Sequence, residues 1–187
     1  MTNTYLTIPN FITCIRLLGT AALPFTTVSS VEFYVIYTIC GVSDVLDGWL
    51  ARILKQSSEF GSRLDSVADL LFYFVMLLMV FPVLWAKLPW QIWIAVGAVI
   101  LLRLVSYTVA AVKYKRFASV HTYANKLTGL LMFSVPYFLP LCFMVAGCFV
   151  VCIATALSSL EEFLIHILSK EYNSNVKSIF MLPKAAK

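Results

Sequence analysis

The chain has 187 residues, of which 61% are hydrophobic and only 12% are charged, with a mean hydropathy of +0.89 and a formal net charge of +5. This composition is too apolar for a water-soluble domain and fits a small membrane protein with several spans. The first residues, M-T-N-T-Y-L-T, contain no positively charged stretch and no A-x-A cleavage site. We therefore expect the first apolar helix to remain as a span.

Hydrophobic runs separated by short polar segments predict an all-α polytopic protein that forms a single membrane domain over residues 1–187. The six predicted transmembrane helices cover residues 9–28, 32–54, 60–84, 91–112, 127–142 and 147–168. Pro9 suits a first helical turn, for which Thr4 or Thr7 can supply the cap. The tail from about residue 169 is polar and rich in lysine, so we expect it to lie at the membrane surface.

The distribution of basic residues predicts the orientation in the membrane. Of the 14 lysines and arginines, 11 lie in the segment between the second and third helices, the segment between the fourth and fifth, and the tail. The loops on the opposite side contain only Lys87. Because positive loops face the cytoplasm, we expect both termini and these two segments to be cytoplasmic.

All four aspartates of the chain, Asp44, Asp47, Asp65 and Asp69, fall within 26 residues. The first two are three residues apart and the last two are four apart, so each pair shares a helix face. Asp44 and Asp69 are centred on residues 56–57, as are Asp47 and Asp65, so a helical hairpin that turns there would bring the two pairs to the same depth. Four carboxylates at membrane depth need compensation. Bound Mg²⁺ or Mn²⁺ is the simplest source, because both are hard cations that prefer oxygen ligands.

This stretch matches the pattern D-x2-D-G-x2-A-R-x8-G-x3-D-x3-D at every fixed position. In this respect the sequence resembles the CDP-alcohol phosphatidyltransferases of class I. The resemblance implies six membrane helices around a polar cavity, here open to the cytoplasm, and a homodimer. It also implies transfer of a phosphatidyl group from CDP-diacylglycerol to an alcohol, with release of CMP. Two metal ions would be held by the four aspartates, with Asp65 bridging them and Asp69 also acting as the general base.

The same resemblance assigns the residues around the first aspartate pair to the CDP-lipid. Gly48 and Gly61 would allow a neighbour or the nucleotide to approach the helix backbone. Arg52, which follows Ala51 in the motif, can form a two-pronged contact with phosphate. Ser58 lies where the family has a hydroxyl near the nucleotide, although it can equally be a simple turn residue.

The start of the first helix, I-P-N-F-I-T-C-I-R, resembles a segment that lies at the nucleotide end of family members. Asn10 and Thr13 are three residues apart, so both can face the donor site, with helix capping as the alternative. Arg16 lies on the same face but deeper. It can reach the lipid phosphate or pair with an acid.

Residues for the acceptor are harder to identify from the sequence. Arg103 lies within a span, where an unpaired charge is costly. Together with His121, Asn125 and Lys126 it can form a basic pocket for a phosphorylated alcohol such as glycerol 3-phosphate. His121 and Lys126 can instead belong to a solvated loop. Phosphatidylglycerophosphate and cardiolipin synthases often have proline after the third aspartate, whereas Ser66 stands here, as in phosphatidylserine synthase-like members.

Several functions therefore stay open at this stage. The acceptor can be a phosphorylated alcohol, serine, or inositol or its phosphate. A carboxylate cluster in a helical bundle also fits a transporter of divalent ions or protons, and a non-catalytic membrane scaffold is a third class. The expected partners are CDP-diacylglycerol, an alcohol and membrane lipids, and no nucleic acid.

Overall fold

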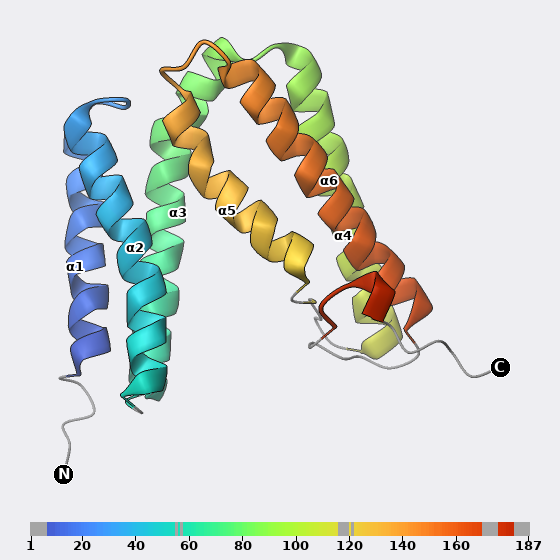
Figure 1. Cartoon of the computed structure of the whole chain (residues 1–187), viewed down its shortest axis with the longest axis horizontal. Helices are drawn as coiled ribbons and strands as arrows, with labels where there is room; N and C mark the ends of the chain where they lie inside the picture. The colour runs from blue at the N-terminus through green and yellow to red at the C-terminus, as the bar shows by residue number, and fades with distance from the viewer. Residues whose placement is uncertain are drawn as a thin grey trace. The chain divides into compact units, whose positions relative to one another are not determined.

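The computed structural model describes residues 7–54, 56, 58–115, 120, 122–169 and 176–181. These residues form helices and connecting segments without a strand (Figure 1). The chain divides into two compact units, Met1–Lys87 and Leu88–Lys187. The first contains α1 (Ile8–Ala22), η1 (Leu23–Phe25), α2 (Val31–Ile53) and α3 (Glu59–Lys87). The second contains α4 (Trp90–Tyr114), α5 (Tyr123–Phe138), α6 (Met144–Leu168) and η2 (Ile179–Met181).

In the first unit, α1 packs against both α2 and α3. The hydroxyl of Thr7 caps α1 by accepting a hydrogen bond of 3.4 Å from the backbone N–H of Asn10. The helix ends at Ala22 and continues as η1, so the prediction that it runs to residue 28 was wrong. Pro24 explains the early end, because proline inside an α-helix removes a hydrogen bond and clashes with the preceding turn.

Stacked aromatic rings join α2 to α3 in the same unit. Tyr37 of α2 stacks on Phe72 of α3 with 5.7 Å between the ring centroids, and it also stacks on Phe33. The three side chains are buried, and burial of rings of this size is a large part of the packing energy of a small unit. This packing holds the faces of α2 and α3 that carry the aspartates against α1.

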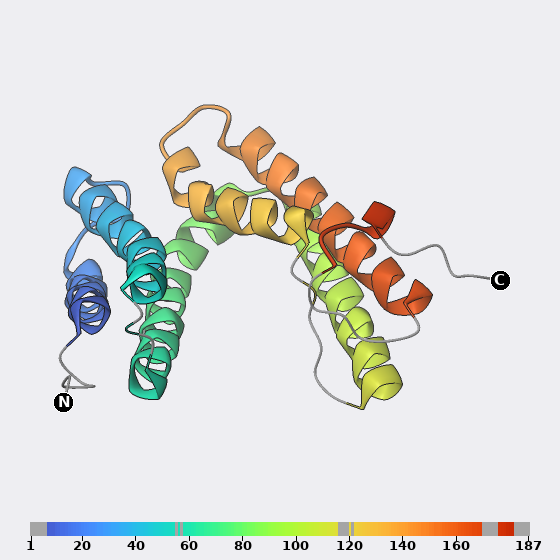
Figure 2. The ribbon, with the colours of Figure 1, turned by 60° about the horizontal axis from the view of Figure 1, so that its bottom comes forward.

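In the second unit, α6 packs against α4 and α5, and it runs beside α4 in both views (Figure 2). Helix α5 begins at Tyr123, because Thr122 caps it by accepting a hydrogen bond from the N–H of Asn125, and it ends at Phe138. The prediction of 127–142 was therefore wrong at both ends. With 16 residues, α5 is about 24 Å long, short of the roughly 30 Å of a bilayer core.

Five helices of the described chain are long and apolar enough to cross a membrane, instead of the six predicted. Their outer faces carry large apolar side chains, and Val31, Leu70 and Leu101 are each more than 60% exposed. An exposed apolar surface of this extent belongs in lipid. The protein is an integral membrane protein with an all-α fold.

Candidate active site

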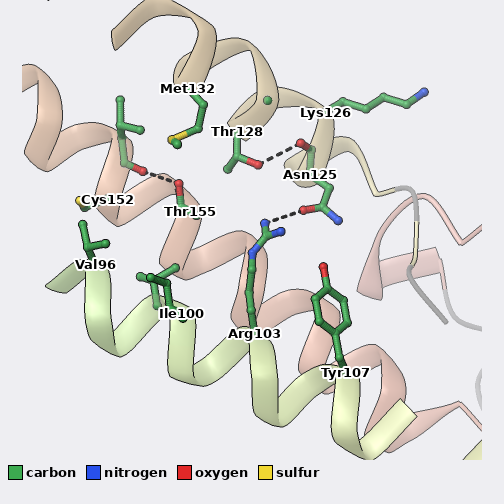
Figure 3. Close-up of a pocket in the computed structure, with 13 residues that line it drawn as sticks. Val96, Ile100, Arg103, Tyr107, Asn125, Lys126, Thr128, Met132, Cys152 and Thr155 are labelled. Carbon is green, nitrogen blue, oxygen red and sulfur yellow. Dashed lines mark hydrogen bonds between the residues drawn. The ribbon is translucent and has the colours of Figure 1, made fainter. Parts of the chain in front are cut away.

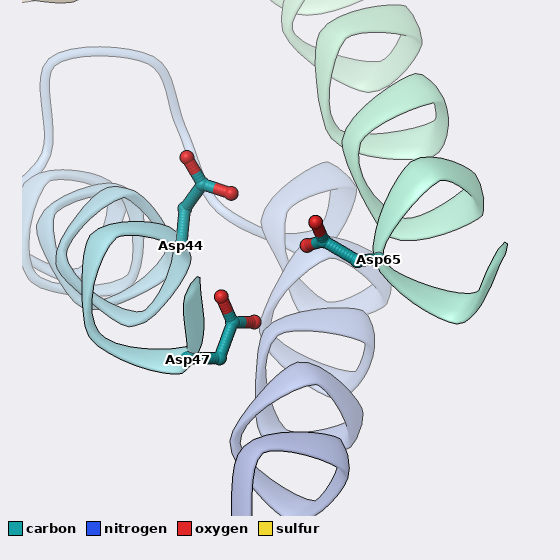
Figure 4. A group of neighbouring side chains, drawn as sticks. All are labelled: Asp44, Asp47 and Asp65. Carbon is teal, nitrogen blue, oxygen red and sulfur yellow. The ribbon is translucent and has the colours of Figure 1, made fainter. Parts of the chain in front are cut away.

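The aspartate pairs meet between α2 and α3. Carboxylate oxygens of Asp44, Asp47 and Asp65 lie within 4.8 Å of one another. Figure 4 shows these three side chains directed toward a shared space. Asp47 is buried, whereas the side chains of Asp44, Asp65 and Asp69 are 40–44% exposed. The site therefore has one buried carboxylate and three that remain accessible from outside the unit.

Arg16 of α1 lies between the two pairs and contacts all four acids. Its Nη1 donates to Asp44 and, over 2.6 Å, to Asp69. Its Nη2 donates to Asp65 and, over 3.1 Å, to Asp47. The side chain is only 1% exposed, and its Nε has no hydrogen-bond partner among the residues that the structure describes. Of the two partners considered for Arg16 from the sequence, an acid is the one found.

Thr13 supports the buried carboxylate. Its hydroxyl oxygen lies 2.8 Å from Oδ2 of Asp47 and 3.1 Å from the carbonyl oxygen of Pro9. A hydroxyl has one proton, so it donates to one of these oxygens at a time. When it donates to Asp47 it fixes the orientation of that carboxylate, which is how outer residues commonly support metal ligands.

A cavity of about 440 Å³ adjoins the acids in the first unit. It brings together all seven residues that were predicted to contact the CDP-lipid. They are Asn10, Thr13, Gly48, Ala51, Arg52, Ser58 and Gly61. Asp47 and Asp65 also line it, as do Pro9, Gln56 and Ser62. A space lined by small residues, hydroxyls and an arginine, with carboxylates at its wall, can hold a nucleotide pyrophosphate next to metal ions.

The two motif glycines have different surroundings. A Cβ on Gly61 would lie 2.6 Å from Oδ1 of Asn10, so this glycine lets α1 approach α3. A Cβ on Gly48 would have no atom within 4 Å, so it would project into open space at the cavity. Gly61 thus serves packing within the protein, and Gly48 leaves room for a molecule that enters.

Two other predicted contacts also make bonds within the chain. The hydroxyl of Ser58 accepts a hydrogen bond of 3.0 Å from the N–H of Gly61 at the start of α3. The exposed Arg52 donates from Nε to the carbonyl oxygen of Gly48 over 3.0 Å. Ser58 therefore has the turn role considered from the sequence and lines the cavity as well, and Arg52 is held beside Gly48.

A second cavity, of about 610 Å³, lies in the second unit among α4, α5 and α6. Its polar lining residues are Arg103, Tyr107, Asn125, Lys126, Thr128 and Thr155. Its apolar lining residues include Val96, Ile100, Met132 and Cys152. In Figure 3, Arg103 and Asn125 point toward one another, and the side chain of Lys126 extends away from them.

Arg103 is held by a hydrogen-bonded network. It donates from Nε to Ser159 and from Nη2 to Oδ1 of Asn125, each over 3.0 Å. The amide nitrogen of Asn125 donates to Oε2 of Glu162 and to the carbonyl oxygen of Val120. Glu162 is 1% exposed and also accepts from the N–H of Val120. Within the described residues, the Arg103 guanidinium thus has hydrogen-bond partners inside a span, and Asn125 connects it to the carboxylate of Glu162.

Of the two remaining acceptor candidates, the structure describes only one. Lys126 is exposed at the rim of this cavity. His121 lies outside the described residues.

Sequence reasoning missed three residues of these sites. Arg16 was considered but left out of the predicted site, although its spacing of three from Thr13 places it on the site face. Gln56 lines the first cavity with its Oε1 buried and unpaired among the described residues, and only its place in the turn hinted at it. Glu162 was missed completely, although an acid in an apolar span is itself a signal.

The acid cluster fits divalent metal ions. It offers hard carboxylate oxygens from two helices, which are the ligands that Mg²⁺ and Mn²⁺ prefer. Four carboxylates with one guanidinium leave three uncompensated negative charges if all are ionised. Asp44, Asp47 and Asp65 lie close enough to share an ion, and Asp69 reaches the same region through its contact with Arg16.

The chain matches one known protein family over most of its length. Residues 6–160 match the profile of the family described as CDP-alcohol phosphatidyltransferase. The chain belongs to this family. Its enzymes transfer substituted phosphate groups, which favours an enzyme over the transporter and scaffold alternatives. No solved structure matches the chain significantly.

Parts of the chain are similar to several curated proteins. A Cereibacter sphaeroides CDP-diacylglycerol–glycerol-3-phosphate 3-phosphatidyltransferase is 38% identical over 71 residues, which cover 33% of this chain and 31% of that protein. The Wigglesworthia glossinidia brevipalpis protein of the same name is 32% identical over 91 residues, covering 43% and 50%. A Mycobacterium tuberculosis protein named as a candidate cardiolipin synthase is 38% identical over 73 residues, covering 37% and 35%. The chain thus spans half or less of the length of these relatives.

Proposed function

We propose that this protein transfers the phosphatidyl group of CDP-diacylglycerol to a phosphorylated alcohol, with glycerol 3-phosphate as the best candidate, and releases CMP. One observation carries the proposal: the seven residues expected to bind the CDP-lipid line one cavity whose wall contains Asp47 and Asp65. The names of the two 3-phosphatidyltransferase relatives support the choice of acceptor. Ser66, at the position where proline is common in such synthases, does not outweigh this support.

The donor is bound by the first unit. Gly48 gives the nucleotide access to the backbone of α2, and Arg52 beside it contacts the phosphates. Asn10, Thr13, Ala51, Ser58 and Gly61 complete the wall around the nucleotide. When bound, Mg²⁺ or Mn²⁺ ions held by Asp44, Asp47, Asp65 and Asp69 would neutralise the pyrophosphate and the charge that develops on it. Because the carboxylates and the donor are both negatively charged, the carboxylates can bind the donor only through these ions.

Asp69 is proposed as the general base. It lies one helical turn beyond Asp65 on α3 and is 40% exposed, so an alcohol can reach it. It takes the proton of the acceptor hydroxyl as that oxygen bonds to the phosphatidyl phosphorus. The bond from phosphorus to the bridging oxygen breaks, and CMP leaves with the electron pair. Asp69 thus gains the proton of the hydroxyl, and CMP carries away the electron pair of the broken bond.

The second unit is proposed to bind the acceptor. Arg103, held by Asn125 and Ser159, offers a fixed guanidinium for the phosphate of the alcohol. Lys126 and His121 are proposed to add positive charge at the entrance. The apolar remainder of this cavity also suits a lipid-linked acceptor, which is the alternative suggested by the cardiolipin synthase name.

The decisive experiment supplies purified protein in lipid vesicles with radiolabelled CDP-diacylglycerol and a panel of alcohols. The panel contains glycerol 3-phosphate, serine, inositol, inositol phosphate and phosphatidylglycerol. We expect release of CMP and formation of phosphatidylglycerophosphate with glycerol 3-phosphate. A different labelled lipid would reassign the acceptor, and no release of CMP with any alcohol would contradict the function.

The orientation and assembly are part of the same proposal. The active site faces the cytoplasm, both termini are cytoplasmic, and the protein is a homodimer with a single membrane domain and a peripheral tail. A membrane-impermeant label should reach a cysteine placed at Ser57 from the cytoplasmic side and one placed at Lys87 from the other side. The reverse pattern would refute the orientation.

A further inference from the structure

The guanidinium of Arg16 occupies the centre of the four-aspartate site. Its two terminal nitrogens divide the acids between them, Nη1 with Asp44 and Asp69, and Nη2 with Asp47 and Asp65. Each nitrogen therefore joins one acid of α2 to one acid of α3. Arg16 itself lies on α1, the remaining long helix of the unit. Its single side chain therefore connects α1, α2 and α3.

Burial makes this arrangement costly to lose. Arg16 is 1% exposed and Asp47 is 4% exposed. A buried charge whose partner is removed is strongly destabilising, because it is left without compensation in a region of low dielectric. The four acids also repel one another if no cation lies between them. Among the described residues, Arg16 is the only cation in an ion pair with any of them.

The four carboxylates that accept from Arg16 are also those that divalent ions would need. Metal ligands must be free of competing donors, and a fixed positive charge near the site lowers its affinity for a cation. Arginine remains protonated throughout the physiological range, so its charge cannot be removed to admit an ion. Competition between Arg16 and the metal ions thus follows from the contacts themselves.

We propose that Arg16 is an internal counter-cation that holds the aspartate site together before metal binds and that must release carboxylate oxygens when ions enter. Arg16 is in this sense a positioning residue that sets the affinity of the site for metal. This inference rests on the proposed metal site. It goes beyond it by assigning a role to a residue of α1 that lies outside the aspartate motif.

The test measures Mn²⁺ binding directly, without turnover. Full-length wild type, Arg16→Gln and Arg16→Lys are purified in detergent, and free Mn²⁺ is followed by electron paramagnetic resonance during titration. We expect Arg16→Gln to bind Mn²⁺ about tenfold tighter or more, since one positive charge beside the ions is lost. Arg16→Lys, which keeps the charge, should bind less tightly than Arg16→Gln. Equal or weaker Mn²⁺ binding by Arg16→Gln would overturn the proposal, as would equally tight binding by both variants.

Thermal unfolding, followed by tryptophan fluorescence, supplies the second readout. In chelator, Arg16→Gln should unfold at a lower temperature than wild type, and saturating Mn²⁺ should stabilise the variant more than it stabilises wild type. If the variant can be purified only with Mn²⁺ present, the rate at which it releases the ion to a chelator replaces the titration. Slower release than from wild type is expected, and release that is equal or faster would overturn the proposal.

Arg63→Gln is the matched control. Arg63 lies on α3 and pairs with Glu59, but both side chains are about 80% exposed. Surface pairs of this kind contribute little, so Mn²⁺ affinity and unfolding temperature should stay at the wild-type values. If wild type itself binds no Mn²⁺, the proposed metal site fails along with this role. If wild type binds Mn²⁺ and Arg16→Gln behaves as Arg63→Gln does, the role of Arg16 alone is wrong.

Discussion

The two units hold their charged groups in different ways. In the first, four aspartates surround one arginine, so negative charge is left over and three of the acids stay accessible. In the second, Arg103 and Glu162 are joined through the neutral amide of Asn125, so this network contains one charge of each sign. A cluster with excess charge is stabilised by a ligand of opposite sign, whereas a network with balanced charges is stable without a ligand.

This difference indicates a division of labour. In the proposed function, metal ions and a nucleotide complete the interactions of the first unit. The second has a rigid polar cluster beside a largely apolar cavity, which suits recognition more than chemistry. Mutations in the first unit should therefore act on turnover and metal, and those in the second on the use of the acceptor.

The largest effect is expected from the proposed metal ligands. Asp44→Asn or Asp65→Asn should reduce CMP release to background, because the loss of one carboxylate misplaces ions that share the others. Excess chelator should have the same effect on wild type. The control is Glu59→Gln, which removes an exposed acid of α3 and should leave turnover unchanged. Full activity in chelator would contradict a metal-dependent first unit and with it the proposed difference between the two units.

A smaller loss is expected at the proposed base. Asp69→Asn should lower turnover by about 10²–10⁴-fold, since an amide cannot take the hydroxyl proton. Affinity for CDP-diacylglycerol should change much less than it does in Asp44→Asn, which loses metal and nucleotide together. Binding and single-turnover measurements on both variants make the comparison. If Asp69→Asn binds donor as poorly as Asp44→Asn, Asp69 is mainly a ligand, and normal turnover would exclude it as the base.

Arg103 tests the second unit. Arg103→Gln should raise KM for glycerol 3-phosphate by roughly 10–100-fold, the loss expected for hydrogen bonds to a charged group. KM for CDP-diacylglycerol should remain near the wild-type value. Lys115→Gln removes an exposed charge just beyond the end of the same helix and serves as the control. An equal rise in both KM values would mean that Arg103 stabilises the protein as a whole.

The two motif glycines should give the smallest effects and differ in kind. Gly61→Ala should destabilise the protein by about 1–3 kcal/mol, because the added methyl group overlaps Asn10. Gly48→Ala should leave the unfolding temperature unchanged and instead weaken donor binding severalfold. Gly97→Ala, which meets no atom within 4 Å, is the control for stability. A drop in unfolding temperature for Gly48→Ala would show that its surroundings are closed rather than open to a ligand.

The spacing of the motif was enough to predict much of the first unit. Residues three or four apart share a helix face whatever surrounds them, so the pairing of Asp44 with Asp47 and of Asp65 with Asp69 was predictable. The symmetric placement of the pairs about residues 56–57 predicted that they meet, and they do. The grouping of Asn10 and Thr13 with them rested on the resemblance to the family, and the structure places both at the same cavity.

Helix ends depended on local signals of different strength. Ser30 caps α2 near the predicted start at residue 32, because its hydroxyl accepts from the N–H of Phe33. The ends of α1 and α5 were misplaced, since the hydropathy of both segments continues past the last helical residue. The start of α5 was misplaced for the opposite reason, because the cap at Thr122 begins the helix before its apolar run does. All six expected long helices are present, but α5 is shorter than a membrane span, because hydropathy alone does not give the length of a helix.

The sequence by itself therefore determined the class of protein, the helix faces that carry the acids and the family to which they belong. Only the tertiary structure decided which partner Arg16 takes, because each of its four acids is at least 28 residues away in the chain. It likewise decided that Glu162 reaches Asn125 across 37 residues. Periodicity fixes which residues share one helix face, but the packing of one helix on another selects the faces that meet, and that choice is made by the whole unit at once.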